Sequence, residues 1–178
     1  MAQQGTLVDA PGVALALGEM AARWSFLEYE LMMVLRHLTG LSHENASAIM
    51  YAVNATSARL DIVRAAAERL PESDTRRQLA IAAVEQCVTL CQRRNALTHH
   101  FWVTDPKGKA HTFDFRYPAD TQGRRVSRSA ESILKYCDEI ADAYQPLCAA
   151  EGGPIEDGYL TEFKTSTTRL RAIISALG

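Results

Sequence analysis

From Leu17 to Leu38 the chain reads LGEMAARWSFLEYELMMVLRHL. Large apolar residues recur here at alternating steps of three and four, which is the period of one face of an α-helix. The pattern predicts one long helix over about 12–39, which Gly40 ends. The apolar face is long enough to serve both a core and a homodimer interface. Its members are Leu17, Met20, Trp24, Leu27, Leu31, Val34 and Leu38.

Two shorter helices are predicted next. Ser42 is the expected N-cap of a helix over about 43–53. Thr56 or Ser57 is the expected N-cap of a helix over about 57–70, because Pro71 cannot continue a helix.

A fourth helix is predicted from Ser73 or Asp74 to about residue 100. Its apolar stripe continues at the same spacing into Asn95 and then Thr98 or His99. A buried polar group without a partner is costly, so we expect this end of the stripe to face a hydrated cleft or a partner. The apolar members of the stripe are Ile81, Val84, Val88 and Cys91.

The residue pattern changes after residue 100. Residues 101–103 and the alternating run 111–117 flank turn residues at 105–108, which together predict a β-hairpin near residues 101–117. A polar loop over 118–126 is expected to follow.

Two more helices complete the chain. The fifth is expected to start at Ser127 or Ser129 and to kink or end at Pro146. The last lies within 151–178, after a Gly-Gly-Pro break. Their apolar stripes are Ile133, Cys137, Ile140, Tyr144 and Leu147 in the fifth, and Leu160, Phe163, Thr167, Leu170, Ile174 and Leu177 in the last. We therefore expect a single, mainly helical domain over 1–178, with residues 1–11 as a leader.

The composition is that of an ordinary globular protein: 178 residues, 47% apolar and 22% charged, with a formal net charge of −2. Proteins that coat nucleic acid are usually basic, so general nucleic-acid binding is disfavoured and no DNA partner is expected, while a local basic patch stays possible. The first residues lack the pattern of a signal peptide, and no stretch reaches the ~18 apolar residues of a membrane span. We therefore expect a cytoplasmic protein, without membrane contact, whose cysteines are reduced.

Residue types that handle phosphate and protons are concentrated in RRNALTHHFW, residues 93–102. The run contains Arg94, Asn95 and His99 at fixed short spacing near the predicted end of the fourth helix. Cationic side chains stabilise helix C-termini, so one interpretation is that the arginines and histidines only cap the helix dipole.

The run from Arg94 to His99 resembles the Arg-x4-6-His signature of the HEPN superfamily, in which the residue after the arginine is often polar, as Asn95 is. The surrounding order is also similar to bacterial HEPN-like proteins of this length. A long first helix with Trp24 precedes a shorter helix pair, and an aromatic residue and a hairpin follow the motif. The resemblance covers about residues 12–150.

This resemblance implies an all-α, up-and-down bundle. With the elements predicted above, we expect a bundle of about five to six helices with one inserted β-hairpin near residues 101–117. Members dimerise so that two motifs face each other. Active members are metal-independent endoribonucleases without a cofactor, often toxins or phage-defence effectors. Others are non-catalytic modules that bind protein or RNA, and this is the alternative function for the chain. A homodimer, an RNA substrate, and an antitoxin or regulatory protein are the implied partners.

Carried over residue by residue, Arg94 and His99 would be the catalytic pair and Asn95 an accessory polar residue. Some toxin members have a modified tyrosine two positions after the histidine, where this chain has Phe101. His100 stands where a small residue is more usual.

The chemistry of these residue types suits RNA cleavage by the 2′-hydroxyl. Histidine titrates near neutral pH and can move the proton, and arginine presents a planar fork to phosphate oxygens. Asn95 and His99 are four positions apart and share a helix face. Arg94 and His99 lie roughly 140° apart around a straight helix, which favours a site shared by two subunits.

Further cations could extend a phosphate-binding surface. We expect Arg93, His100, Arg124 and Arg125 to bind RNA or phosphate, with Arg128 in the same basic cluster. A solvated loop is the alternative interpretation of that cluster. Cys87 and Cys91 lie on one helix face but lack paired ligands elsewhere, so small core residues are favoured over a metal site.

Overall fold

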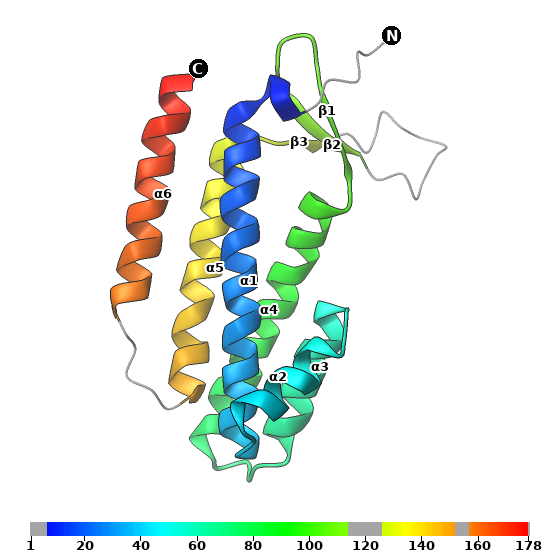
Figure 1. Cartoon of the computed structure of the whole chain (residues 1–178), viewed down its shortest axis with the longest axis vertical. Coiled ribbons are helices and arrows are strands. Elements are labelled where there is room, and N and C mark those ends of the chain that lie inside the picture. Colours follow the sequence, from blue (N-terminus) through cyan, green and yellow to red (C-terminus); the bar gives the residue numbers. More distant parts are fainter. Residues whose placement is uncertain (1–6, 114–125, 152–156, 178) are drawn as a thin grey trace. The chain divides into compact units, whose positions relative to one another are not determined.

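The computed structural model describes residues 7–113, 126–151 and 157–177 (Figure 1). Six α-helices and one small antiparallel sheet make up this part of the chain, which confirms the predicted all-α helical bundle with an inserted hairpin. A short 3-10 helix, η1, precedes them at Leu7–Asp9. The helices are α1 (Pro11–Thr39), α2 (His43–Tyr51), α3 (Thr56–Glu68), α4 (Thr75–Thr98), α5 (Ala130–Glu151) and α6 (Asp157–Leu177), and the strands are β1 (Phe101–Thr104), β2 (Ala110–Phe113) and β3 (Val126–Ser127).

The chain divides into two compact units. Unit 1 comprises Met1–Ala22, Gln92–Asp138 and Phe163–Gly178, and unit 2 comprises Arg23–Cys91 and Glu139–Glu162. The run that resembles the HEPN signature lies wholly in unit 1. No described helix combines the length and apolar character that a membrane span requires.

The apolar stripe predicted for α1 is confirmed. Every member is buried except Leu17, which is half-buried. Gly40 follows the helix with φ of +69°, a left-handed conformation that favours glycine, and its N–H bonds to Arg36 O at 2.9 Å.

The helix starts in unit 2 agree with the sequence in two cases of three. Ser42 Oγ accepts from Asn45 N at 3.3 Å at the start of α2. Asp74 Oδ1 accepts from Arg76 N at 2.9 Å at the start of α4. The cap predicted for α3 is wrong, because Ala55 occupies that position and makes no side-chain cap. The hydroxyl of Thr56 is used elsewhere.

Glu28 on α1 is the centre of a largely buried polar cluster in unit 2, in which Trp24 and Thr56 are buried and Glu28 and Arg59 are half-buried. Its Oε1 accepts from Thr56 Oγ1 at 2.6 Å and from Trp24 Nε1 at 3.2 Å, and its Oε2 lies 2.8 Å from Arg59 Nη1. The Nε of Arg59 also donates to the carbonyls of Met50 and Val53, each at 2.9 Å. This cluster ties α3 to α1 and to the segment between α2 and α3.

The hairpin of unit 1 is confirmed, with a third strand that the sequence did not predict. In β1 and β2, Trp102 lies opposite Thr112. β3 pairs with β2 and occupies positions predicted as loop or helix start. Residues 114–117 of the predicted second strand, and 118–125 of the predicted loop, lie outside the described residues.

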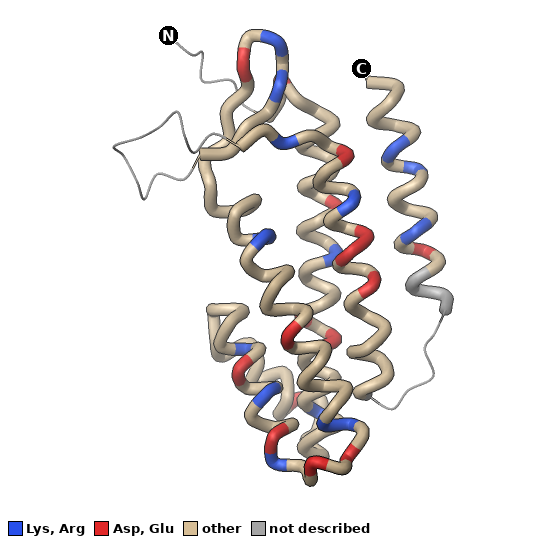
Figure 2. The backbone as a smooth tube through the Cα atoms, turned by 180° about the vertical axis from the view of Figure 1, so that it is seen from behind, with Lys and Arg blue, Asp and Glu red and all other residues tan. Residues whose placement is uncertain are grey.

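Asp105 organises the turn between β1 and β2. Its Oδ1 accepts from Lys107 N and Lys109 N, each at 2.9 Å, and its Oδ2 lies 3.3 Å from the buried His111. These hydrogen bonds lower the pKa of Asp105, and the bond from Lys109 N has the largest effect. Figure 2 shows acidic and basic residues on this turn, which are Asp105, Lys107 and Lys109.

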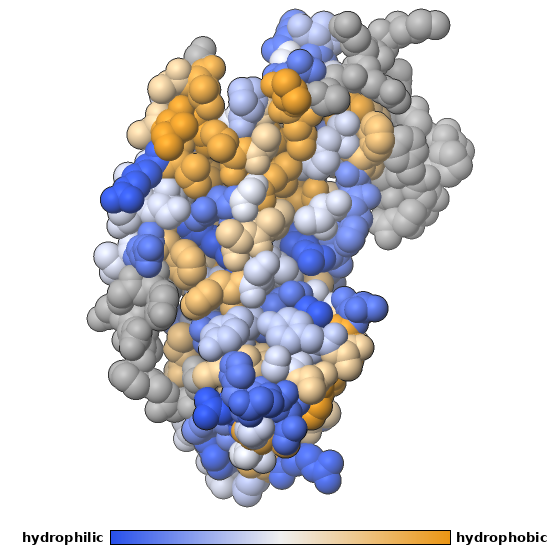
Figure 3. Space-filling model, in the orientation of Figure 1, coloured by the Kyte–Doolittle hydropathy of each residue, from blue (hydrophilic) through white to orange (hydrophobic). Residues whose placement is uncertain are grey.

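The two C-terminal helices differ in how well their stripes are buried. The predicted stripe of α5 is fully buried, and the helix continues through Pro146 to Glu151. In α6 only Thr167 of the described stripe residues is buried, and Leu177 is exposed, contrary to the prediction. Leu177 and Ile173 contribute to the apolar surface at the end of α6 (Figure 3).

Candidate functional site

The Arg94–His99 run forms the last turn of α4 and the residue after it. Arg94 Nη1 donates to Asn95 Oδ1 at 2.9 Å, so these two neighbouring side chains form one polar unit. His99 follows the helix directly, and its N–H donates to Asn95 O at 2.9 Å. Helical backbone geometry therefore places the three predicted catalytic residues on consecutive turns of one helix end in unit 1.

The face of α4 that points inward differs from the prediction. Asn95 and His99 are exposed, whereas Arg94 is half-buried and Leu97 is buried. Small residues form as much of the buried face as large ones do. Towards the end of α4 this face continues from Cys91 through half-buried Arg94 to Leu97. The prediction followed the larger residues Ile81 and Val88, which are only half-buried, and so placed the inward face about one residue too far along the chain.

The last carbonyls of α4 obtain hydrogen bonds from groups other than the cationic side chains of the run. Thr98 Oγ1 donates to Arg94 O at 3.0 Å, and Trp102 Nε1 donates to Leu97 O at 2.9 Å. With the His99 N–H on Asn95 O, two of the last four carbonyls of α4, those of Asn95 and Leu97, have a donor. The donors to these carbonyls and to Arg94 O are a hydroxyl, an indole and a backbone N–H, and the interpretation of the arginines and histidines as charges that stabilise the helix dipole stays a prediction.

The remaining predicted phosphate-binding residues are not all in one place. Arg93 is exposed, and its guanidinium carbon lies 4.7 Å from the centre of the Tyr136 ring on α5. His100 is half-buried immediately before β1. Arg124 and Arg125 lie outside the described residues.

Sequence reasoning missed a cavity beside the run. It has a volume of about 270 Å³ and lies between the end of α4 and the start of α5, within unit 1. The signal in the sequence was Arg128, which was grouped with the basic loop. Tyr136 was not singled out, because its place on α5 gives no sign that it lies under Arg93. The lining residues are Gln92, Arg93, Ala96, Leu97, Arg128, Ser132, Ile133 and Tyr136.

The cysteines behave as small core residues. Cys87 and Cys91 are buried, and burial together with the neighbouring Cys91 raises the pKa of Cys87 to about 12. Such a thiol stays protonated and is a poor metal ligand at neutral pH. Within the described ranges, no group of three or more histidine, cysteine or acidic residues is placed to hold a metal ion.

The chain matches no family model, no curated protein and no solved structure. The likeness of the 94–99 run to the HEPN signature therefore stays a prediction.

Proposed function

We propose that the protein is a HEPN-like, metal-independent endoribonuclease that acts as a homodimer in the cytoplasm, as a toxin or phage-defence effector held in check by an antitoxin or other regulatory protein. The observation that carries the proposal is the Arg94–Asn95 hydrogen bond at the end of α4, with the exposed His99 one turn further on. A cation, an amide and an imidazole thus occur together at one solvent-accessible helix end.

Each of the three groups has a role in cleavage by the 2′-hydroxyl. His99 moves a proton at the attacking or the leaving oxygen. The guanidinium of Arg94 stabilises the extra charge on the phosphate in the transition state. Because Asn95 Oδ1 accepts from Arg94, the amide group that Asn95 turns to a phosphate oxygen is its NH₂. The chemistry needs neither a metal nor a cofactor.

A second copy of the chain completes the site in this proposal. Within one copy, Arg94 is half-buried and His99 is exposed. In the proposal, the His99 of one copy therefore acts on a phosphate together with the Arg94 of the other. Two copies that face each other at this helix end bring together two arginines and two histidines around one phosphate. The surface at the end of α4 is then part of the dimer interface.

A non-catalytic protein- or RNA-binding module is the second candidate. It is favoured by the surroundings of His99, because none of the described residues makes a hydrogen bond with its imidazole ring. A catalytic base is usually held in place by a third group. If RNA or a partner subunit does not supply that group, His99 contributes to binding alone.

The proposal is tested with a panel of single-stranded and structured RNAs incubated with the protein in EDTA. The wild type is expected to cut at least one RNA, and Arg94→Ala and Asn95→Ala are expected to lose activity while they stay folded and dimeric. Arg169→Ala is the matched control, because Arg169 is an exposed arginine of α6 outside the motif. A folded, dimeric wild type that cuts no RNA, alone or with its regulatory partner removed, would leave the binding module as the better account.

A further inference from the structure

The cavity beside the motif brings together two arginines that come from different elements. Arg93 is on the last turns of α4, and Arg128 lies between β3 and α5. Buried Leu97, Ile133 and Tyr136 are among its lining residues. None of the eight described residues that line the cavity is acidic. The site is therefore cationic, with apolar side chains in its wall.

The position of Arg128 is fixed by the sheet. Its N–H donates to Ala110 O at 2.9 Å, and its Nε donates to Thr112 Oγ1 at 3.2 Å. Partial burial and, after it, the charge of Arg93 lower the pKa of Arg128. Two like charges held at one cavity repel each other, and an anion bound between them removes this cost.

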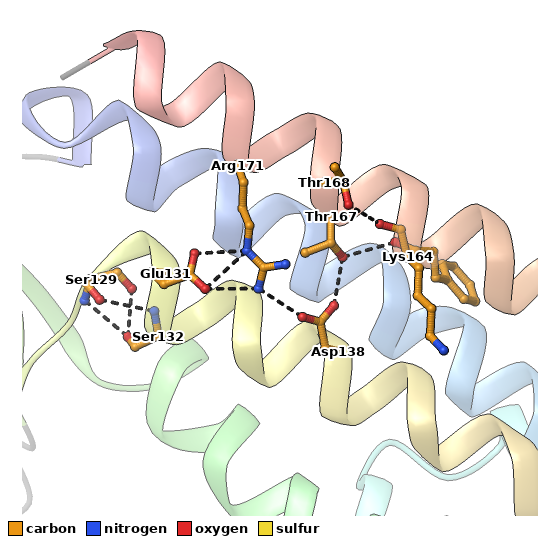
Figure 4. Close-up of polar contacts among 9 residues, drawn as sticks. Ser129, Glu131, Ser132, Asp138, Lys164, Thr167, Thr168 and Arg171 are labelled. Atoms are coloured by element: carbon orange, nitrogen blue, oxygen red, sulfur yellow. Dashed lines mark hydrogen bonds and ion pairs between the residues drawn. The ribbon is translucent and has the colours of Figure 1, made fainter.

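Two acidic residues of α5 take part in another contact. Glu131 and Asp138 on α5 both pair with Arg171 on α6, each at 3.0 Å, as Figure 4 shows. Thr167 also donates to Asp138 at 3.0 Å. These carboxylates therefore serve the contact between α5 and α6, and neither is among the residues that line the cavity with the two arginines.

The start of α5 adds a polar hydroxyl to the cavity. Ser129 and Ser132 bond reciprocally, with Ser132 N donating to Ser129 Oγ at 3.1 Å and Ser129 N donating to Ser132 Oγ at 3.2 Å. This arrangement is a capping box, in which the side chain of Ser132 takes the part that glutamate often plays. Ser132 thus lines the cavity at a helix start, where a negative charge is favoured.

We propose that this cavity is a phosphate-binding site, separate from the Arg94–Asn95 unit, in which Arg93 and Arg128 hold a phosphate group and Ser132 lines the wall. Guanidinium groups match the oxygens of a phosphate group, and two of them line this cavity. The group is either the terminal phosphate of a free nucleotide or a backbone phosphate of RNA. The proposal adds to the proposed function a second place to hold phosphate, and it does not depend on cleavage.

Isothermal titration calorimetry with inorganic phosphate, AMP and a short oligouridylate tests the site. Arg93→Gln and Arg128→Gln are expected to weaken binding roughly 10- to 100-fold, the usual effect of losing a charge-assisted hydrogen bond. Arg169→Gln, which removes the same charge from an exposed position on α6, is expected to bind as the wild type does. Tighter binding of AMP identifies a free nucleotide as the ligand, and tighter binding of the oligouridylate identifies RNA.

The variant Ser132→Glu separates a loss of phosphate binding from a loss of folding. It keeps the capping box, so the melting temperature is expected to stay the same or rise, while the new carboxylate competes with phosphate and binding falls. Wild-type protein that binds none of the three probes, or Arg93 and Arg128 variants that bind like the wild type, would overturn the proposal. Calorimetry measures binding without cleavage, so the phosphate-binding proposal can be confirmed or refuted even if the protein cuts no RNA.

Discussion

Replacing Glu28 with leucine is expected to destabilise the protein by about 3–5 kcal/mol, the usual effect of removing one partner of a buried ion pair. Only 15% of the Glu28 side chain and 12% of the Arg59 side chain are exposed, so water compensates little for the loss. The change removes the carboxylate that lies 2.8 Å from Arg59 Nη1, 2.6 Å from Thr56 Oγ1 and 3.2 Å from Trp24 Nε1. For a chain of this length, 3–5 kcal/mol corresponds to a fall in melting temperature of roughly 6–20 °C.

Urea unfolding followed by far-UV circular dichroism measures the effect. The control is Asp74→Asn, which breaks an ion pair of similar length, 2.6 Å to Arg76. The Arg76 side chain is 44% exposed, against 12% for Arg59, so solvent screens this pair and the expected loss of stability is clearly smaller than in Glu28→Leu. The double variant Glu28→Leu/Arg59→Leu is expected to recover a large part of the stability lost in Glu28→Leu, because it leaves no unpaired buried charge.

Equal losses in Glu28→Leu and Asp74→Asn would refute this reasoning, because they would show that burial of the Glu28 cluster has no energetic weight. The reasoning would also fail if the double variant Glu28→Leu/Arg59→Leu were clearly less stable than Glu28→Leu. In that case Arg59 would stabilise the fold through its bonds to the carbonyls of Met50 and Val53 rather than through Glu28.

Two further predictions concern pH. The raised pKa of Cys87 means that its protonated form stabilises the fold below pH 9, and this contribution is lost as pH rises from 9.0 to about 12. At pH 8, iodoacetamide is expected to modify Cys87 only after unfolding, and modification of the native protein at the rate of half-buried Cys148 would contradict this. The lowered pKa of Asp105 means that its contribution is present above the ordinary value of 3.8 and is lost as pH falls below it. Trp102 fluorescence is expected to report loosening of the hairpin in acid in the wild type and a smaller acid response in Asp105→Asn, whereas identical titrations would argue against a role for this carboxylate.

The helices could be predicted because each carries a long periodic pattern. The stripes of α1 and α5 are buried almost as expected, since each extends over five or more turns and any local irregularity averages out. Pro146 shows the strength of this pattern. The helix continues past the proline because Leu147 and Ala150, which follow it, are fully buried.

Features that depend on distant contacts could not be predicted. Thr56 has the residue type of an N-cap, but its hydroxyl bonds to Glu28 on another helix, and no local pattern reveals that partner. The two-residue strand β3 is too short to carry an alternating pattern, and it exists because β2 offers it a pairing edge.

The candidate site was predicted in part. The sequence locates Arg94, Asn95 and His99 at the end of α4, and the structure places them there. Val84 and Cys91 of the predicted stripe are buried. The predicted inward face is nevertheless shifted by about one residue, because Ala80, Ala83 and Cys87 are buried while the larger Ile81 and Val88 are only half-buried. Size is a poor guide where small residues form the buried face of a helix. Arg93 and Arg128 line one cavity because α4 packs against α5. The sequence of a single segment does not reveal this packing.

The rate of RNA cleavage in EDTA by wild type, His99→Ala and His37→Ala tests the central claim most directly. His37 is an exposed histidine of α1 outside the motif, so its loss is expected to leave the rate unchanged. Loss of a general acid or base typically slows a reaction 10²- to 10⁴-fold, and we expect His99→Ala to fall in that range while its melting temperature and dimer content match the wild type. Cleavage by His99→Ala at the wild-type rate would contradict the account.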